Sequence, residues 1–334
     1  MEKQISIIIP TYNMEKFIGR CLDSLLIPEI DAVDVIVVND GSKDRSSEIA
    51  HHYANRFPDS IRVIDKPNGN YGSCINAALP VATGRYVRIL DADDWFDTEA
   101  FSMLVKDIEK INTDVVFTRC SVFYEVDGHV DPQNYKGLIY NRVIDLNTYS
   151  IPKECLKMHC ITYKTAFLKK IGYYQTEGIS YTDNEYVVGP LLLAEKFWAV
   201  DYSLYQYRIG RDGQSVSIQS IVKNVDHYIN VIQKLTTFKA LNSKRDSEIR
   251  RPLLFRLIRI VLEVFCLFRV SSKIQEAEVN DILTELSKRY PEETKKLFGH
   301  CIRLLPLYYL WYVKPRLYYS IVFPIVKLKE KSNH

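Results

Sequence analysis

Residues 89–95 read Ile-Leu-Asp-Ala-Asp-Asp-Trp, so three carboxylates follow an apolar run that begins at Tyr86 and precede a helical pattern that begins near Thr98. A strand ending here would carry its acidic side chains at the carboxyl edge of a sheet, where open α/β sheets bind their ligands. Two or three carboxylates suit a hard divalent cation that completes its shell with water and phosphate oxygens. The alternative is an acidic turn that only caps the following helix. The local sequence leaves both interpretations open.

The first hundred residues alternate strand and helix patterns, which predicts a mostly parallel sheet flanked by helices. Right-handed crossovers would bring the ends of the parallel strands to one edge. Asp40, in the turn 39–42, and the acidic run 91–94 should therefore face one crevice. The predicted strands are 5–10, 33–38, 62–64 and the segment from Gly84, and the predicted helices are 15–26, 42–56 and 73–79.

The next hundred residues are more mixed. A strand is predicted at 113–118, a Tyr-rich hairpin within 121–146 and a last strand at 200–207, followed by a polar glycine loop. The run Thr182-Asp183-Asn184-Glu185 matches a capping box, with Thr182 as the cap and Glu185 bonding back to it. After about Ser217 the pattern is mostly helical, with no internal repeat.

Composition excludes several classes of protein. The 44 basic and 41 acidic residues leave a formal net charge of only +3, so no bulk field indicates a nucleic-acid partner. The seven cysteines form no Cys-x-x-Cys pair and do not combine with histidines at zinc-ligand spacing, which favours reduced thiols in a cytoplasmic protein. The apolar run near the N-terminus is too short for a signal peptide, and no run approaches the ~18 apolar residues of a membrane span.

Residues 219–334 form a separate, mainly helical C-terminal region in this interpretation. An amphipathic helix is predicted over 252–270, and the segments 304–313 and 317–326 are apolar and aromatic with basic flanks. Short apolar stretches beside basic and aromatic residues suit a membrane interface. Packing on the rest of the protein, or a homo-oligomer contact, accounts for the same pattern equally well.

Three motifs in order, Ser-Ile-Ile-Ile-Pro-Thr-Tyr-Asn at 6–13, Val-Val-Asn-Asp-Gly-Ser at 37–42 and Leu-Asp-Ala-Asp-Asp at 90–94, resemble family 2 glycosyltransferases. The resemblance covers about residues 4–218. It implies an α/β protein with the Rossmann-like GT-A fold, a nucleotide-diphosphate-sugar donor, a divalent metal (Mn²⁺ or Mg²⁺) and inversion at the anomeric carbon. On this basis 1–218 would be the catalytic domain, with nucleotide-sugar binding in about 1–100 and the acceptor side in about 101–218.

The resemblance also implies roles for single residues at the nucleotide. Pro10, Thr11 and Tyr12 would border the base, and Asp40 would form a hydrogen bond with the base or ribose. Asn68 and the loop 69–72 would close over the nucleotide. Asn39 stands where the family usually has the first of two acids, which removes one negative charge. The alternatives are a strand-ending turn at Asp40 and a plain loop at Asn68.

Further residues would serve the metal and the chemistry. Asp93 would be the direct metal ligand, and Asp91 would lie near the ribose and metal. Asp183 resembles the second acid of the family's Glu-Asp pair, although Thr182 replaces the Glu, and would be the general base, with Glu185 as the alternative. Arg208 and Arg211 would approach the diphosphate. Asp183 could instead be an acid favoured by the helix dipole, and the two arginines could simply be solvated.

The sequence thus predicts an inverting transferase that moves a sugar from a nucleotide-sugar, expected to be a UDP-sugar, to a hydroxyl of a glycan or lipid-linked saccharide. Such an enzyme would serve polysaccharide or glycoconjugate synthesis in the cytoplasm, or at the inner face of the cell membrane as a peripheral protein. Two rivals remain. One is a nucleotidyltransferase, although the sequence has no glycine-rich, lysine-bearing phosphate loop near the first strand. The other is a catalytically silent nucleotide-sugar-binding scaffold.

Overall fold

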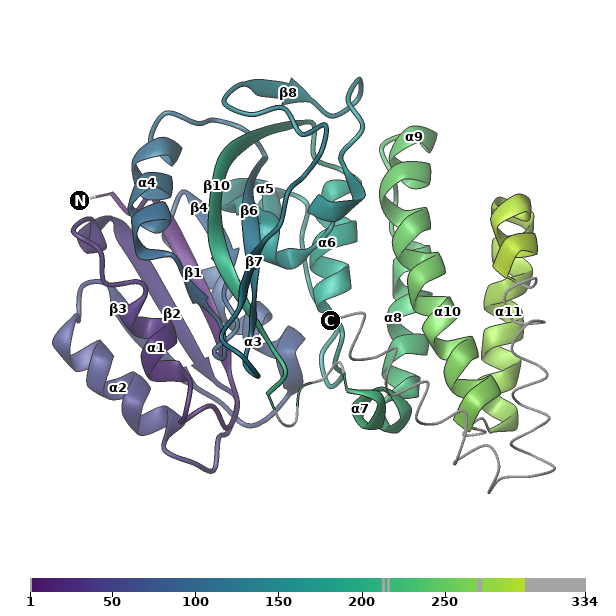
Figure 1. Cartoon of the computed structure of the whole chain (residues 1–334), viewed down its shortest axis with the longest axis horizontal. Coiled ribbons are helices and arrows are strands. Elements are labelled where there is room, and N and C mark those ends of the chain that lie inside the picture. The colour runs from purple at the N-terminus through teal and green to yellow at the C-terminus, as the bar shows by residue number, and fades with distance from the viewer. Residues whose placement is uncertain (1, 212–213, 215–216, 269–271, 298–334) are drawn as a thin grey trace. The chain divides into compact units, whose positions relative to one another are not determined.

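The computed structural model of the chain describes residues 2–211, 214, 217–268 and 272–297 (Figure 1). The chain divides into two compact units, Met1–Arg211 with Phe238–Arg250, and Asp212–Thr237 with Arg251–His334. The boundary predicted near residue 218 divides a catalytic domain from a helical C-terminal region. This functional division stays a prediction.

The first unit is built on one ten-stranded sheet with the order β3-β2-β1-β4-β9-β6-β10-β5. In it β1, β2, β3 and β4 are parallel, β9 runs antiparallel to β4 and β6, and β10 is parallel to β6. The short strands β7 and β8 pair antiparallel with β6 and β10. The bounds are β1 Ile5–Thr11, β2 Val33–Asn39, β3 Ile61–Asp65, β4 Tyr86–Ile89, β5 Trp95–Phe96, β6 Val115–Tyr124, β7 Val130–Pro132, β8 Val143–Asp145, β9 Ile161–Lys164 and β10 Lys196–Ile209.

The central strands are apolar because helices cover both faces of a parallel sheet. Every residue of β2 is buried, and in β1 only Pro10 is partly accessible. The helices of this unit are α1 Ile18–Asp23, α2 Ser46–Arg56, α3 Asn70–Ala78, α4 Thr98–Ile108, α5 Thr165–Lys170, α6 Asp183–Leu191 and α9 Ser243–Arg245. The predicted α/β fold, with its sheet flanked by helices, is confirmed.

Helix α4 begins directly after the acidic run because Asp97 caps it. The Asp97 carboxylate accepts a hydrogen bond of 2.9 Å from the Ala100 amide, which satisfies one of the free N–H groups of the first turn. The buried face carries Phe101, Leu104 and Ile108, at the spacing of an amphipathic helix. The cap fixes where the acidic loop ends.

The capping box predicted at the start of α6 is wrong. The Thr182 side chain makes no capping hydrogen bond, and its hydroxyl accepts a bond of 2.9 Å from Gln175 Nε2 instead. The Glu185 carboxylate accepts a bond of 2.9 Å from the Thr176 amide. The Thr182 hydroxyl and the Glu185 carboxylate, which the local pattern assigned to the cap, are thus both hydrogen-bonded to residues 175 and 176.

The second unit is helical where it is described. Its helices are α7 Ile218–Lys223, α8 Val225–Thr237, α10 Arg251–Phe268 and α11 Lys273–Arg289. Helix α10 corresponds to the amphipathic helix predicted over 252–270; it packs against α8, and Leu254, Ile258 and Val261 are among its buried residues. The predicted interfacial segments at 304–313 and 317–326 lie outside the described residues. Within the described part of the chain, no helix combines the length and the apolar character that a membrane span requires.

Two glycines, each inside a helix, give a matched test of the packing around α3. A Cβ added at Gly72 would lie 2.0 Å from the Thr176 carbonyl oxygen, whereas nothing lies within 4 Å of one added at Gly19 in α1. We expect Gly72→Ala to destabilise the protein by about 1–3 kcal/mol through overpacking. Gly19→Ala should stabilise the protein by about 0.5–1 kcal/mol, because alanine lowers the conformational entropy of the unfolded chain. Urea denaturation measures both, and equal stabilities for the two variants would contradict the close packing of α3 on residue 176.

Candidate active site

The strand register brings the predicted site residues to one edge of the sheet. Thr11 pairs with Asn39, and Asn39 pairs with Asp65, so the carboxyl ends of β1, β2 and β3 lie side by side. Ile8 pairs with Ile89, so the acidic loop after β4 follows at the same edge. Segments about 50 residues apart in sequence therefore meet here, as the right-handed crossovers predicted.

Asp40 lies in the turn after β2 and is 3% exposed. Its Oδ1 accepts hydrogen bonds from Lys66 Nζ at 2.6 Å and from the Gly69 amide at 2.9 Å. Its carbonyl oxygen accepts a bond of 3.0 Å from Asn68 Nδ2. Asp40 thus links the turn to the loop that starts α3, and the structure joins the two segments that sequence reasoning assigned to the nucleotide.

The end of β1 offers one exposed aromatic ring to this edge. Tyr12 is 46% exposed, whereas Thr11 is buried and its hydroxyl donates to the Ile9 carbonyl oxygen at 3.2 Å. Pro10 precedes them within the strand. Of these three residues, Tyr12 presents the surface that a planar base could stack on.

The acidic loop is held in place from several sides. The Asp91 carboxylate accepts a bond of 2.8 Å from the Tyr71 hydroxyl. Asp94 is 2% exposed, and its two oxygens accept bonds of 2.7 Å from the Tyr205 hydroxyl and the Arg208 amide. Asp93 forms an ion pair with Arg211. The three acids therefore have different surroundings, and both oxygens of Asp94 are engaged by protein donors.

Burial and mutual repulsion make this loop a poor place for negative charge. Burial, and next the charge of Asp93, raise the pKa of Asp91 to about 7. The same two causes raise the pKa of the Asp94 carboxyl well above its ordinary value. A cation bound here would offset both effects.

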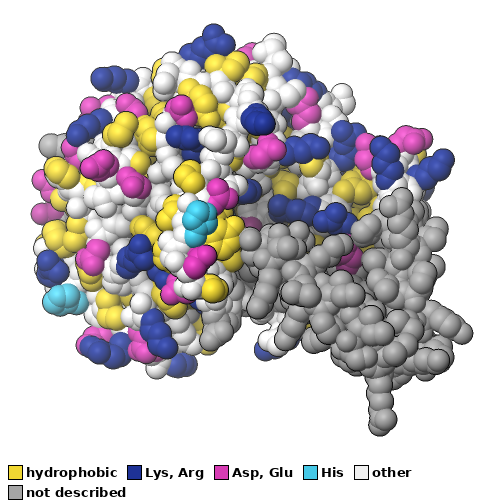
Figure 2. Space-filling model, viewed as in Figure 1, with side chains coloured by type: hydrophobic (Ala, Val, Ile, Leu, Met, Phe, Trp, Pro, Cys, Tyr) yellow, Lys and Arg dark blue, Asp and Glu magenta, His cyan; other side chains and the backbone are white. Residues whose placement is uncertain are grey.

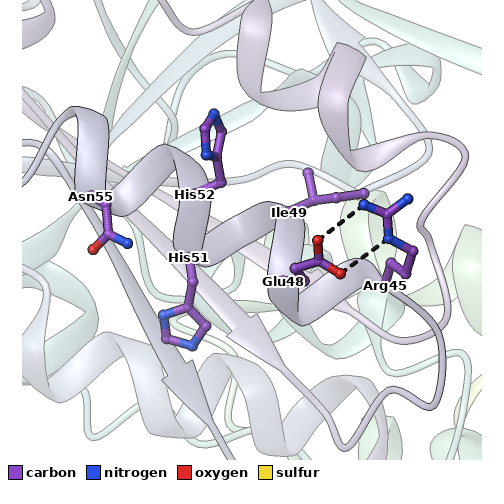
Figure 3. A pocket seen from close by; sticks show the side chains of 6 residues that line it. All are labelled: Arg45, Glu48, Ile49, His51, His52 and Asn55. Carbon is purple, nitrogen blue, oxygen red and sulfur yellow. Dashed lines mark hydrogen bonds and ion pairs between the residues drawn. The ribbon is translucent and has the colours of Figure 1, made fainter.

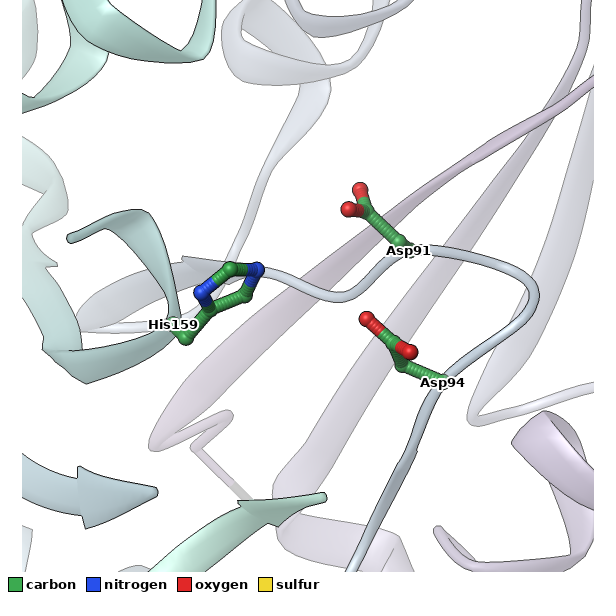
Figure 4. A group of neighbouring side chains, drawn as sticks. All are labelled: Asp91, Asp94 and His159. Atoms are coloured by element: carbon green, nitrogen blue, oxygen red, sulfur yellow. The ribbon is translucent and has the colours of Figure 1, made fainter. Parts of the chain in front are cut away.

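His159 lies beside two of these acids. One ligand atom each from Asp91, Asp94 and His159 lies within 4.8 Å of the others, and Figure 4 shows the three side chains turned toward one space. Burial lowers the pKa of His159 to about 3, so the imidazole is neutral, which is the form that binds metals. The ring stacks on Tyr207 at 4.4 Å between centroids, and the His159 carbonyl accepts a hydrogen bond from the buried Arg88. Sequence reasoning missed His159, because a single histidine without a spaced partner carries no pattern.

Arg208 and Arg211, predicted to approach a diphosphate, both lie against the acidic loop. The Arg208 Nε donates to the Asp93 carbonyl oxygen at 2.9 Å, and its guanidinium also pairs with Glu125 and lies 5.1 Å from the Trp95 ring centroid. Arg211 contacts the Asp93 carboxylate itself. Arg208 therefore braces the loop, and Arg211 is the better placed of the two to exchange its carboxylate for a bound anion. Asp212 and Gly213, next in the predicted loop, lie outside the described residues.

Asp183 begins α6 and is partly buried. Burial raises the pKa of Asp91 and of the Tyr71 and Tyr207 hydroxyls, and the charge of Asp183 adds to each shift, so Asp183 lies within electrostatic reach of the acidic loop. Asn184 Nδ2 donates to the Asp183 carboxylate at 3.2 Å. Glu185 is fully buried and holds the Thr176 amide. Asp183 is thus within electrostatic reach of the acidic loop, whereas Glu185 lies in the protein interior.

The Tyr205 hydroxyl is a single atom that joins two parts of the acidic loop. It donates to Asp94 and accepts a bond of 3.1 Å from the Asp91 amide. We expect Tyr205→Phe to lower the free energy of unfolding by about 1–3 kcal/mol, because two buried polar groups lose their partner. Urea denaturation tests this, with Tyr12→Phe at an exposed position as the control. Equal stabilities would show that the hydroxyl does not hold the loop.

One open hollow of about 560 Å³ lies on α2 and the residue before it. It is lined by Arg45, Glu48, Ile49, His51, His52 and Asn55, and Figure 3 shows the Arg45–Glu48 ion pair among them. It includes none of the predicted site residues. On the face seen in Figure 2, acidic and basic side chains are interspersed, in agreement with the net charge of +3.

Comparison with known proteins identifies the family. The sequence profile of Glycosyl transferase family 2 matches residues 6–172, which is half of the chain. The chain belongs to this family. It is 37% identical over 259 residues to the chondroitin synthase of Pasteurella multocida, covering 72% of this chain and 24% of the synthase. It spans 32% of the length of each of two other bacterial glycosyltransferases that it matches.

Solved structures agree with this family 2 assignment at the level of the fold. The structure of Staphylococcus aureus TarS residues 1–349 in complex with UDP-GlcNAc matches with a TM-score of 0.65 at 21% identity, covering 92% of this chain and 91% of that one. A mannosyltransferase from Pyrobaculum calidifontis, in complex with GDP-Man and Mn²⁺, matches with a TM-score of 0.55 at 14% identity, covering 94% and 89%. The predicted GT-A fold is thereby confirmed.

Proposed function

We propose that this family 2 protein is an inverting glycosyltransferase that moves a sugar from a UDP-sugar to a hydroxyl of a glycan or lipid-linked saccharide. The observation that carries the proposal is the convergence of the Asp40 turn and the acidic loop at one edge of the sheet, with Asp183 within electrostatic reach of that loop. Open α/β sheets bind ligands at this edge. The similarity to chondroitin synthase supports polysaccharide synthesis as the setting.

The nucleotide would bind across the ends of β1 and β2. Tyr12 would stack on the base, Asp40 would accept a hydrogen bond from the base or ribose, and Asn68 would hold the loop that covers them. Pro10 and Thr11 would border the same site. UDP is the first choice of nucleotide because the TarS structure contains UDP-GlcNAc.

The acidic loop fits a divalent cation, Mn²⁺ or Mg²⁺, by its chemistry. Asp91, Asp94 and the neutral His159 each bring one donor atom within 4.8 Å of the others, and carboxylate oxygens with an imidazole nitrogen form a donor set that Mn²⁺ accepts. Asp93 remains the proposed second acid, because both oxygens of Asp94 are already engaged. A bound cation supplies Lewis-acid stabilisation of the departing nucleoside diphosphate.

The acceptor hydroxyl would lose its proton to Asp183. An inverting transfer needs a carboxylate that takes this proton on the face opposite the leaving group. Asp183 is partly accessible near the acidic loop, whereas Glu185, the alternative base, is buried and bonded to the backbone. Arg211 would turn from Asp93 to the diphosphate as the donor binds, since guanidinium groups pair well with phosphate oxygens.

A thermal-shift screen of nucleotide-sugars, with and without Mn²⁺, tests this function. We expect a UDP-sugar to raise the melting temperature, and to do so more strongly with Mn²⁺, because a ligand that binds only the native state stabilises it. No stabilisation by any nucleotide-sugar would contradict the proposal. Release of pyrophosphate would favour a nucleotidyltransferase, and donor binding without hydrolysis or transfer would favour a silent scaffold.

Peripheral contact with the inner face of the cell membrane is the part of the proposal that rests on the sequence of residues 300–334. We expect the full chain to float with vesicles that contain anionic lipids, and a chain ending at residue 299 to float less, because basic and aromatic residues favour the interface. Sedimentation of both chains measures the alternative, a homo-oligomer contact. Equal flotation would contradict membrane binding through this segment.

A further inference from the structure

A polar cluster lies directly behind the Asp40 turn. Asp65, the last residue of β3, accepts hydrogen bonds on Oδ1 from Asn39 Nδ2 at 2.7 Å and from the Ser47 hydroxyl at 2.9 Å. Its Oδ2 lies 2.7 Å from His51 Nε2. Asn39, the last residue of β2, is its register partner in the sheet. Residues of two strands and α2 therefore meet at one carboxylate.

The carboxylate of Asp65 determines which way the Asn39 amide points. A carboxylate only accepts hydrogen bonds, so Asn39 must present its NH₂ group to Asp65. The amide oxygen of Asn39 then points the other way and accepts a bond of 3.1 Å from the Ser42 amide. That bond closes the turn in which Gly41 has a φ of +73°.

The turn closed in this way carries Asp40. The Asp40 amide donates to the Thr11 carbonyl oxygen at 2.8 Å, and the Asp40 carboxylate accepts hydrogen bonds from Lys66 Nζ and the Gly69 amide. If the Asn39 amide were reversed, the Ser42 amide would face an NH₂ group, and the turn would lose its cross-link. The direction of the Asn39 side-chain amide thus affects the position of the carboxylate of the next residue, Asp40.

We propose that Asp65 is a positioning residue for the nucleotide: through Asn39 it orients the turn that holds Asp40, without touching the ligand. This inference rests on the proposed function, in which Asp40 binds the nucleotide. It extends that site to the end of β3, where sequence reasoning placed no functional residue.

A plain surface ion pair between Asp65 and His51 is the simpler explanation of the cluster. Their side chains are 48% and 49% exposed, and a pair with that exposure contributes little to stability. Asn39 differs, because it is only 6% exposed and water cannot readily replace its partner. The expected effect therefore passes through Asn39 and not through His51.

A charge swap tests the inference. Asn39→Asp sets two carboxylates against each other across a contact of 2.7 Å. Adding Asp65→Asn restores one amide and one carboxylate with reversed polarity. The new NH₂ group at position 65 can donate to position 39 and to the Ser47 hydroxyl, while its oxygen accepts from His51, so every partner in the cluster is satisfied.

The measurement is UDP binding by isothermal titration calorimetry, with GDP run in parallel and a melting temperature for each variant. We expect Asn39→Asp to raise the Kd for UDP about tenfold or more, because repulsion between two carboxylates replaces the hydrogen bond from position 39 to Asp65 and displaces the turn. The double variant should recover most of this loss at a melting temperature near that of the wild type. Asn55→Asp, the same change at an exposed position of α2, should leave the Kd unchanged.

Three outcomes would overturn the inference. An unchanged Kd in Asn39→Asp would show that the pair does not position Asp40. A double variant that binds UDP as weakly as Asn39→Asp, at normal melting temperature, would show that Asp65 is not the partner that matters. If the wild-type protein binds neither UDP nor GDP, the proposed function itself fails and this inference fails with it.

Discussion

Replacing Asp183 by asparagine is expected to lower the rate of sugar transfer by about 10²- to 10⁴-fold, because a positioned general base contributes that much to a proton transfer. Asparagine keeps the size of the side chain and its bond with Asn184 but cannot accept the acceptor's proton. Donor binding should remain, since Asp183 belongs to the acceptor half of the proposed site. Single-turnover transfer and UDP-sugar titration measure the two quantities separately.

Two neighbouring acids provide controls for the base assignment. Glu177→Gln changes an exposed acid that bonds Asn76 and Tyr174, and it should leave transfer unchanged. Glu185→Gln alters a buried acid that holds the Thr176 amide, so it should lower stability more than rate. A Glu185 variant that is stable but inactive, beside an active Asp183→Asn, would reverse the assignment.

Replacing Asp93 by alanine is expected to lower the transfer rate by about 10²- to 10³-fold and to remove the Mn²⁺-dependent part of donor stabilisation. The reason is that a Lewis acid contributes several kcal/mol at the leaving group. The fold should persist, because Asp94 and not Asp93 accepts the buried hydrogen bonds from Tyr205 and Arg208 that hold the loop. Mn²⁺ titration, followed by melting temperature with UDP present, measures the metal without relying on activity.

The ion pair of Asp93 with Arg211 requires its own control. Arg211→Gln breaks the same pair but keeps the carboxylate, so it should weaken donor binding while Mn²⁺ still stabilises the complex. Asp94→Asn should instead destabilise the loop, because an amide cannot accept from both Tyr205 and Arg208. Two results together would contradict the assignment to Asp93. If Asp93→Ala keeps near-normal turnover, and Asp94→Asn loses metal binding while its stability stays normal, the metal ligands are Asp94, Asp91 and His159.

The parallel half of the sheet could be predicted from sequence because its signals are local. β1 and β2 are mostly apolar segments of seven residues, each followed by turn residues. Because both are parallel strands joined by right-handed crossovers, their ends share the edge at which Asp40 and Asp91 lie. The predicted strands and observed strands there differ by one or two residues. The helix predicted at 15–26 was less accurate, since α1 covers only Ile18–Asp23 and its flanks are turns.

The second half of the sheet could not be predicted in the same way. β9 inserts antiparallel between β4 and β6, and β5 has two residues, so neither strand has a pattern of its own. His159 lies beside the acidic loop because β9 begins shortly after it, at Ile161, and Arg88 of β4 donates to the His159 carbonyl oxygen. The incorrect capping box has the same origin, because Gln175 and Thr176 compete for its groups from outside the local pattern.

The central claim, inverting transfer of a sugar with release of a nucleoside diphosphate, is tested most directly by proton NMR of a reaction started with the stabilising UDP-sugar. The account predicts that UDP is released and that the first product of an α-linked donor carries the β configuration at its anomeric carbon. Retention of configuration, or release of pyrophosphate in place of UDP, would contradict it.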